Sequence, residues 1–220
     1  MTAHTIPNLV LNNGASIPQI GFGTLHVPPD RTSSPANTAI TAEIVGMALE
    51  LGYRHIDTAQ MYGNERGVGQ GIAASGVPRG QLYVTSKLGN GNHHPDDVRR
   101  SFDETLHKLG LEYLDLFLIH WPLPTLYDGD YVSTWKAMAN LLDDGRLRSV
   151  GVSSFQPAHL DRIIAETGIV PVVNQIEVHP GFNNTAARDA SARHGIAVEA
   201  FSPLGQGKAL EDEVISGIAA

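Results

Sequence analysis

Apolar positions along this chain follow two patterns. One has the period of an α-helix, and the other consists of the short continuous or alternating runs that are typical of strands. The two kinds of segment take turns from residue 19 onward. The predicted strands span 19–24, 54–57, 82–86, 114–119, 149–152, 172–177 and 196–200. The predicted helices span 35–51, 64–75, 95–109, 131–142, 157–166, 185–194 and 211–220.

A β-hairpin is predicted before this alternation begins. Segments 9–11 and 15–18 flank Asn12-Asn13-Gly14, and an Asn-Gly pair between apolar runs is a strong signal for a tight turn. The first predicted helix, 35–51, carries apolar residues at helical spacing. These residues are Ile40, Ile44, Met47, Ala48 and Leu51.

Strict alternation of strand and helix favours a parallel sheet, and we interpret residues 1–220 as a single (β/α)₈ TIM barrel domain behind an N-terminal β-hairpin. The last strand and helix of such a barrel are missing from the sequence, so we expect a longer expressed protein or a tail that orders with cofactor. A doubly wound open sheet is the alternative. It is weakened because the glycines at 67, 69 and 71 fall inside a predicted helix and have the wrong spacing for a dinucleotide fingerprint.

Composition narrows the function classes. With 42 % hydrophobic and 17 % charged residues the chain is typical of a soluble globular protein. The net charge of -8 and the lack of a basic stripe argue against a nucleic-acid partner. There is no cysteine, which excludes thiolate chemistry. The N-terminal residues do not resemble a signal peptide and no apolar run is long enough for a membrane span, so we expect a cytoplasmic protein.

Ionisable side chains stand at the ends of three consecutive predicted strands. Asp57 ends the second strand and Tyr62 follows in its loop, Lys87 ends the third strand, and His120 with Trp121 follows the fourth. Strand ends of a parallel barrel meet at one mouth, where catalytic groups gather. On its own, Asp57 could equally cap the next helix and Tyr62 could be a packing residue.

Together these groups suit proton transfer to a carbonyl oxygen. A phenol is a weak acid at neutral pH, but a neighbouring cation stabilises the phenolate, and Lys87 can be that cation. Asp57 can pair with Lys87, and His120 can donate a hydrogen bond to the substrate oxygen. None of these groups carries a hydride, so a reductant is required, and nicotinamide is the obvious one.

Five ordered motifs make the chain resemble the aldo-keto reductase family. They are GYRHIDTAQMYGNE, LFLIHWP, VGVSSF, VNQIEVHP and AFSPLG. The resemblance, to the small prokaryotic members in particular, implies an NADPH-dependent enzyme, commonly a monomer, that reduces small aldehydes, ketoaldehydes or ketones. It also implies Tyr62 as general acid, with Asp57, Lys87 and His120 completing a tetrad.

The resemblance carries over further positions. It implies that Ser153, Ser154 and Gln175 contact the nicotinamide carboxamide, and that Phe201 stacks on the ring. Cofactor contacts are further implied for Ser202 and Leu204 in the pyrophosphate loop and for Gly23 and Thr24 beneath the cofactor. Phe22 and Trp121 would wall the substrate pocket beside Tyr62 and His120. Ser154 and Phe201 depart from the family's usual Asn and Tyr, and the clamp for the adenosine phosphate, which decides between NADP and NAD, would lie beyond Ala220.

Two other functions stay open at this point. A Schiff-base aldolase would use Lys87 as its nucleophile, although this leaves Tyr62 unexplained. A cofactor-binding module without turnover would keep the same residues idle. No metal site is expected, because His93 and His94 lie in a Gly-Asn-rich loop of the kind that is usually solvated. The remaining histidines are interpreted as structural or surface groups, and these include His55, His159, His179 and His194.

Overall fold

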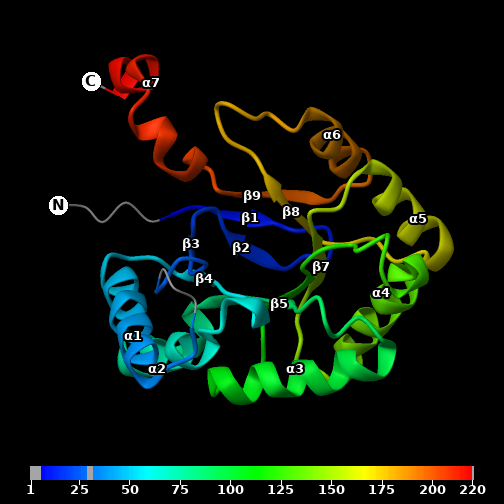
Figure 1. The fold of residues 1–220 in the computed structure, drawn as a ribbon, viewed down its shortest axis with the longest axis horizontal. Coiled ribbons are helices and arrows are strands. Elements are labelled where there is room, and N and C mark those ends of the chain that lie inside the picture. Colours follow the sequence, from blue (N-terminus) through cyan, green and yellow to red (C-terminus); the bar gives the residue numbers. More distant parts are fainter. Residues whose placement is uncertain (1–5, 29–31, 220) are drawn as a thin grey trace.

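Seven parallel strands form the main sheet, and they follow one another in chain order in the computed structural model, which describes residues 6–28 and 32–219 (Figure 1). The strands are β3 (Gly21–Gly23), β4 (His55–Asp57), β5 (Tyr83–Leu88), β6 (Leu116–Ile119), β7 (Val150–Ser153), β8 (Val173–Glu177) and β9 (Ala197–Phe201). A doubly wound sheet would reverse its strand order at a switch point, and this sheet never does. The predicted barrel is therefore confirmed as a near-closed barrel. In the described part of the chain, β3 and β9 each pair with one neighbour only.

The helices lie around the outside of the strands, except the last one, which stands apart from the sheet (Figure 1). They are α1 (Pro35–Glu50), α2 (Glu65–Ala74), α3 (Pro95–Leu109), α4 (Tyr131–Asn140), α5 (Pro157–Thr167), α6 (Thr185–Arg193) and α7 (Glu213–Ala219). These bounds agree with the predicted helices to within about two residues at each end, and Ala220 lies outside the described residues. Within residues 6–28 and 32–219, none of the helices combines the length and the apolar character that crossing a membrane requires.

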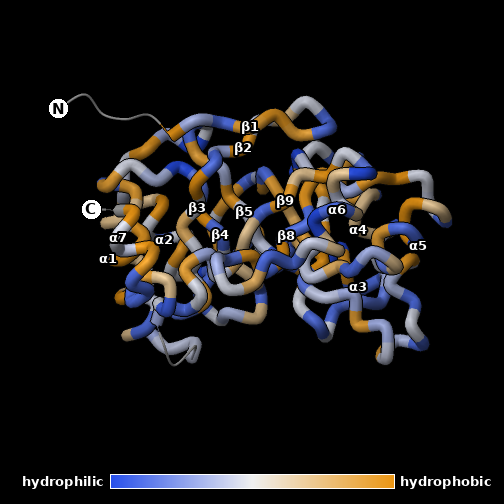
Figure 2. Tube along the Cα trace, turned by 90° about the horizontal axis from the view of Figure 1, so that it is seen from above, coloured by the Kyte–Doolittle hydropathy of each residue, from blue (hydrophilic) through white to orange (hydrophobic). Residues whose placement is uncertain are grey.

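The predicted hairpin is present and closes one end of the barrel. Strands β1 (Asn8–Val10) and β2 (Ser16–Pro18) pair antiparallel and lie across that end in Figure 2. Leu11 and Ile17 pack against a small core inside the barrel that includes Leu116 and Leu118. The turn is anchored as well, because Asn12 donates a hydrogen bond to the Pro171 carbonyl (2.9 Å) and Asn13 donates one to the Ser149 hydroxyl (3.0 Å).

Helix α1 buries only part of its apolar surface. Thr41, Val45, Ala48 and Leu49 are buried, whereas Ile40, Met47 and Leu51 are exposed. Apolar residues occur on both sides of this helix, so spacing alone could not choose between them. The outcome is set by α2, the element with which α1 makes its most extensive contact. Ile40 and Met47 of α1, with Leu51 directly after it, form an apolar stripe on the outer surface.

The three glycines of α2 have a packing role. A Cβ atom on Gly69 would lie 2.1 Å from the Leu109 carbonyl oxygen at the end of α3. A Cβ atom on Gly67 would lie 2.6 Å from the Thr41 Cβ atom of α1, and Gly71 is equally close to the Ala42 carbonyl oxygen. These glycines let α2 lie between two helices at a distance that no side chain permits, which explains them without a phosphate ligand.

Candidate active site

Asp57 and Lys87 form a buried ion pair inside the mouth of the barrel. Asp57 pairs in register with Thr85 on β5, so Lys87, two residues further along, projects from the same interior face. The Lys87 Nζ atom lies 2.5 Å from Asp57 Oδ1 and 3.2 Å from the Thr58 carbonyl oxygen. Burial works to lower the pKa of Lys87, but the charge of Asp57 and the nearby Tyr62 outweigh it, so the pKa is raised and the side chain stays an ammonium.

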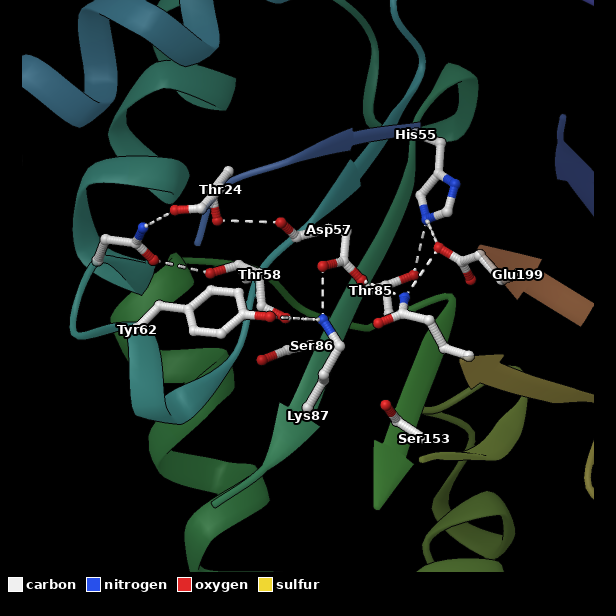
Figure 3. Close-up of polar contacts among 12 residues, drawn as sticks. Thr24, His55, Asp57, Thr58, Tyr62, Thr85, Ser86, Lys87, Ser153 and Glu199 are labelled. Carbon is white, nitrogen blue, oxygen red and sulfur yellow. Dashed lines mark hydrogen bonds and ion pairs between the residues drawn. The ribbon is translucent and has the colours of Figure 1, made fainter. Parts of the chain in front are cut away.

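Tyr62 reaches this ion pair from a short 3₁₀ helix, η1 (Gln60–Tyr62). Its hydroxyl oxygen lies 3.3 Å from Lys87 Nζ. The turn is fixed at its start by Gln60, whose side chain accepts a hydrogen bond from the Gly89 amide (2.6 Å) and donates one to the Ser101 carbonyl (3.0 Å). It ends at Gly63, which adopts the left-handed conformation (φ 70°) that favours glycine. Figure 3 shows Tyr62, Lys87 and Asp57 converging from their separate elements.

His120 follows β6 and faces the same group. Its ring lies 5.7 Å from the ring of Tyr62, edge to face. Burial, assisted by the charge of Lys87, lowers the pKa of His120 to about 4, so the imidazole is neutral at pH 7. The structure thus brings together the four predicted strand-end residues, and the neutral ring keeps one N–H group that can serve as a donor.

Ser153 and Gln175 extend this constellation to β7 and β8, where they are paired in register. The Gln175 amide nitrogen donates to Asp57 Oδ2 and to Glu199 Oε1, both at 2.9 Å. Ser153 is buried, and its hydroxyl lies 3.5 Å from that of Ser154. Ser154 has a φ of 62°, a left-handed conformation that Asn, the residue usual in the family, tolerates better than Ser.

The other predicted cofactor positions lie around β9 and β3. Phe201 and Ser202 are partly exposed at the end of β9, and Leu204 beyond them is exposed. Gly23 is open to solvent beside Asp57. Thr24 is fully buried, and both its amide and its hydroxyl donate to the Asp57 carbonyl at 3.0 Å, so its side chain holds β3 to β4.

Phe22 requires a correction. Its neighbours Gly21 and Gly23 face the barrel interior, since a Cβ atom on Gly21 would meet the His55 ring at 2.8 Å. Alternation along a strand then places the Phe22 side chain on the outer face. There it packs edge to face on Tyr53 (5.5 Å between ring centroids) and against the core beneath the helices. The expectation that Phe22 walls the substrate pocket was therefore wrong. Trp121, beside His120, is 45 % exposed and stays a candidate for the wall of the substrate pocket.

Two residues of the interior were missed as site candidates. Glu199 of β9 contacts Gln175, and burial raises the pKa of its carboxyl group although His55 acts in the opposite direction. His55 of β4 is buried, with its Nε2 atom 2.9 Å from the Thr85 hydroxyl and 4.0 Å from Glu199 Oε1. The signal in the sequence that could have found them is a two-residue spacing along a strand. His55 lies two residues before Asp57, and Glu199 lies two residues before Phe201, so each pair shares one face of its strand.

His93 and His94 pack around Tyr127, His93 stacked on its ring and His94 edge to face. Through these ring contacts the pair packs the loop of Tyr127 against the loop that follows β5. Within residues 6–28 and 32–219, no group of three or more His, Cys, Asp or Glu side chains is placed to hold a metal ion.

Comparison with known proteins agrees with this fold. The model of the aldo/keto reductase family matches residues 19–218. The chain belongs to the aldo/keto reductase family, which confirms the recognition from the five sequence motifs. The family is one of oxidoreductases that use NADP(H), so the expected enzyme class is confirmed as well.

Individual relatives cover most of the chain. An aldo-keto reductase of Mycolicibacterium smegmatis is 49 % identical over 97 % of this chain and 74 % of its own length. The D/L-glyceraldehyde reductase of Hypocrea jecorina is 42 % identical over 90 % of this chain and 63 % of its own length. Among solved structures, an aldo/keto reductase from Brucella melitensis superposes with a TM-score of 0.87 at 44 % identity, covering 98 % of this chain and 78 % of the other. The Bombyx mori enzyme in complex with NADP gives 0.82 at 41 % identity, covering 91 % and 67 %.

Proposed function

We propose that this chain reduces the carbonyl group of small aldehydes, ketoaldehydes or ketones to an alcohol, with NADPH as cofactor and Tyr62 as general acid. When bound, NADPH supplies the hydride. The observation that carries the proposal is the distance of 3.3 Å between the Tyr62 hydroxyl and a buried Lys87 ammonium that Asp57 holds in place. Proton donation by Tyr62 leaves a phenolate, and a fixed cation at this distance stabilises it.

His120 is proposed to orient the substrate. Because its pKa is lowered to about 4, the ring stays neutral at pH 7 and can donate its single N–H to the carbonyl oxygen without competing with Tyr62 as the acid. Its neighbour Trp121 offers an exposed aromatic surface for the apolar part of a substrate. A hydrogen bond from His120 would place the substrate oxygen near the Tyr62 hydroxyl, because the two rings are in contact.

The residues present fit the nicotinamide group. Gln175 uses its amide nitrogen within the protein, and its side-chain oxygen has no hydrogen-bond partner among the described residues. With Ser153 and Ser154 beside it, this oxygen suits the carboxamide of the cofactor. Phe201 would stack on the ring, Ser202 and Leu204 would follow the pyrophosphate, and Gly23 allows close approach. The Bombyx mori relative was solved with NADP, which supports the choice of cofactor.

The substrate class and setting are proposed at a coarse level. The Hypocrea jecorina relative is named for glyceraldehyde, a small polar aldehyde, which supports small carbonyl compounds as substrates. The net charge of -8 supports the absence of nucleic-acid partners. We also propose that the protein is a single-domain, cytoplasmic monomer. Sedimentation of the purified chain would test the oligomeric state.

The aldolase alternative loses support from the same geometry. A lysine that forms a Schiff base must give up its proton to act as a nucleophile. Lys87 is instead paired with Asp57 at 2.5 Å, and its pKa is raised. Proton transfer is therefore the better-supported chemistry for this site.

The test compares NADPH consumption by the chain with that of Tyr62→Phe, using a small ketoaldehyde. We expect Tyr62→Phe to lose activity by at least about a hundredfold, as for a general acid, while it still binds NADPH. Titration of each protein with NADPH, followed by fluorescence, is the control for binding. Equal turnover by both proteins would remove Tyr62 from the mechanism, and NADPH binding without turnover by the parent chain would favour the binding module.

A further inference from the structure

The Gln175 side chain is held by two carboxylates at once. Its amide nitrogen lies 2.9 Å from Asp57 Oδ2 and 2.9 Å from Glu199 Oε1. A carboxylate oxygen accepts hydrogen bonds, so the NH₂ group and not the carbonyl must face both acids. This settles the amide orientation, and it uses both N–H groups of Gln175. The side-chain oxygen is then the one polar atom of this side chain left for a ligand.

Resting on the function proposed above, we infer that Glu199 is a positioning residue for the cofactor. It acts through Gln175, whose amide plane it fixes so that the side-chain oxygen accepts a hydrogen bond from the nicotinamide carboxamide. Glu199 itself does not touch the reacting atoms.

Asp57 alone cannot hold the amide in this way. A side chain held through one N–H can still turn about that hydrogen bond, whereas two hydrogen bonds in different directions fix the plane of the amide. Asp57 is also engaged with Lys87, through its other oxygen. Glu199 is supplied by β9, where it is the register partner of Gln175, so its acceptor oxygen lies directly beside the amide.

The surroundings of Glu199 keep it in place. His55 approaches Glu199 Oε1 at 4.0 Å, and the His55 ring is oriented by its 2.9 Å contact with the Thr85 hydroxyl (Figure 3). Burial raises the pKa of Glu199, but a carboxyl group keeps an acceptor oxygen whether or not it is protonated. The positioning role therefore requires a hydrogen-bond acceptor and not a charge. Glu199→Gln keeps an acceptor oxygen and Glu199→Leu does not, so the two variants should behave differently.

The experiment is a double-mutant cycle on NADPH affinity. Glu199→Leu, Glu199→Gln, Gln175→Leu and the double variant Glu199→Leu/Gln175→Leu are titrated with NADPH beside the parent chain. We expect Glu199→Leu to raise the Kd about 5- to 30-fold, because it leaves a buried N–H without a partner. Glu199→Gln can turn its own amide oxygen to Gln175, so its Kd should stay within about twofold of the parent value. In the Gln175→Leu background, Glu199→Leu should add nothing.

A second measurement does not depend on the cofactor. The two side-chain amide protons of Gln175 are followed by NMR in the unliganded parent, Glu199→Gln and Glu199→Leu proteins. Only Glu199→Leu should lose the hydrogen-bonded shift of one of these protons. Thermal unfolding of each variant identifies any that fail to fold. If Glu199→Leu fails to fold, Glu199→Gln still tests the inference, because it should keep the hydrogen-bonded proton shift of Gln175.

The outcomes separate the inference from the function on which it rests. A parent chain that binds no NADPH overturns the proposed function, and the cofactor role of Glu199 falls with it. If the parent binds NADPH and Glu199→Leu binds it equally well, the inference alone is overturned. The same holds if Glu199→Leu weakens binding by the same factor with and without Gln175, since its effect would then not pass through Gln175.

Discussion

The strands on the two sides of this barrel differ in how they are supported. On the side of β4 to β6 every strand has two neighbours, and Asp57, Tyr62 and Lys87 are all buried there. On the other side β3 and β9 each have one neighbour in the described residues, and Leu204 near the end of β9 is exposed. We call these the supported side and the open side. The proposed proton chemistry belongs to the first, and much of the proposed cofactor binding to the second.

The apolar surface follows the same division. On α1, beside β3 in the sequence, Ile40, Met47 and Leu51 are exposed. On and before α7, which follows β9, Leu210, Val214 and Ile218 are exposed as well. The chain spans 74 % of the length of its Mycolicibacterium smegmatis relative. The proposed catalytic residues Asp57, Tyr62 and Lys87 are therefore buried and ordered although β3 and β9 each have one neighbour in the described residues.

A large effect on stability is expected on the supported side, at Gly69 of α2. A Cβ atom there would lie 2.1 Å from a backbone oxygen, so Gly69→Ala must move α2 away from α3. We expect a loss of about 3 kcal/mol in the free energy of unfolding, measured by urea denaturation. Gly46→Ala in α1 is the matched control, because a Cβ atom there meets nothing within 4 Å. It should be neutral or stabilise by up to about 1 kcal/mol, and a similar loss at both sites would contradict the packing role of Gly69.

Sequence reasoning found the strand ends because their neighbours carry a clear pattern. Asp57, Lys87 and His120 each stand at the end of a buried run, and parallel pairing makes such ends converge. It failed where one step along a strand reverses the face, as at Phe22. Glu199 was missed because its hydrogen bond with Gln175 joins two different strands, and such a contact is visible only in three dimensions.

A second prediction concerns Phe201 on the open side. Its ring is partly exposed, so Phe201→Ala should cost less than about 1 kcal/mol in unfolding free energy yet raise the Kd for NADPH about tenfold through lost stacking. Phe102→Ala on α3 offers the contrast, because that ring is fully buried and its loss should cost about 3–5 kcal/mol. Fluorescence titration and urea denaturation measure the two quantities. An unchanged Kd for Phe201→Ala would remove this residue from the cofactor site.

The smallest predicted effect is a pH dependence at His93. Burial, with the charge of His94, lowers the pKa of His93 to about 4, whereas an unfolded histidine titrates near 6.5. Between these values the unfolded chain binds the proton and the folded chain does not, so this group contributes stability above about pH 6.5 that is lost as the pH falls toward 4.

His93→Asn removes this contribution. We expect the parent chain to lose on the order of 1 kcal/mol more than His93→Asn between pH 7 and pH 5, by urea denaturation at each pH. His107→Asn, at an exposed position of α3, is the control and should follow the parent chain. Parallel pH profiles for the parent and His93→Asn would show that His93 titrates normally in the folded protein.

The hairpin that closes one end of the barrel has a consequence for the order of assembly. Its turn residues Asn12 and Asn13 bond to Pro171 and Ser149, partners that lie 159 and 136 residues further along the chain. A ribosome makes the hairpin first, yet these partners emerge only after most of the barrel has been synthesised. The hairpin must therefore wait for segments that are made more than a hundred residues later before its turn can dock.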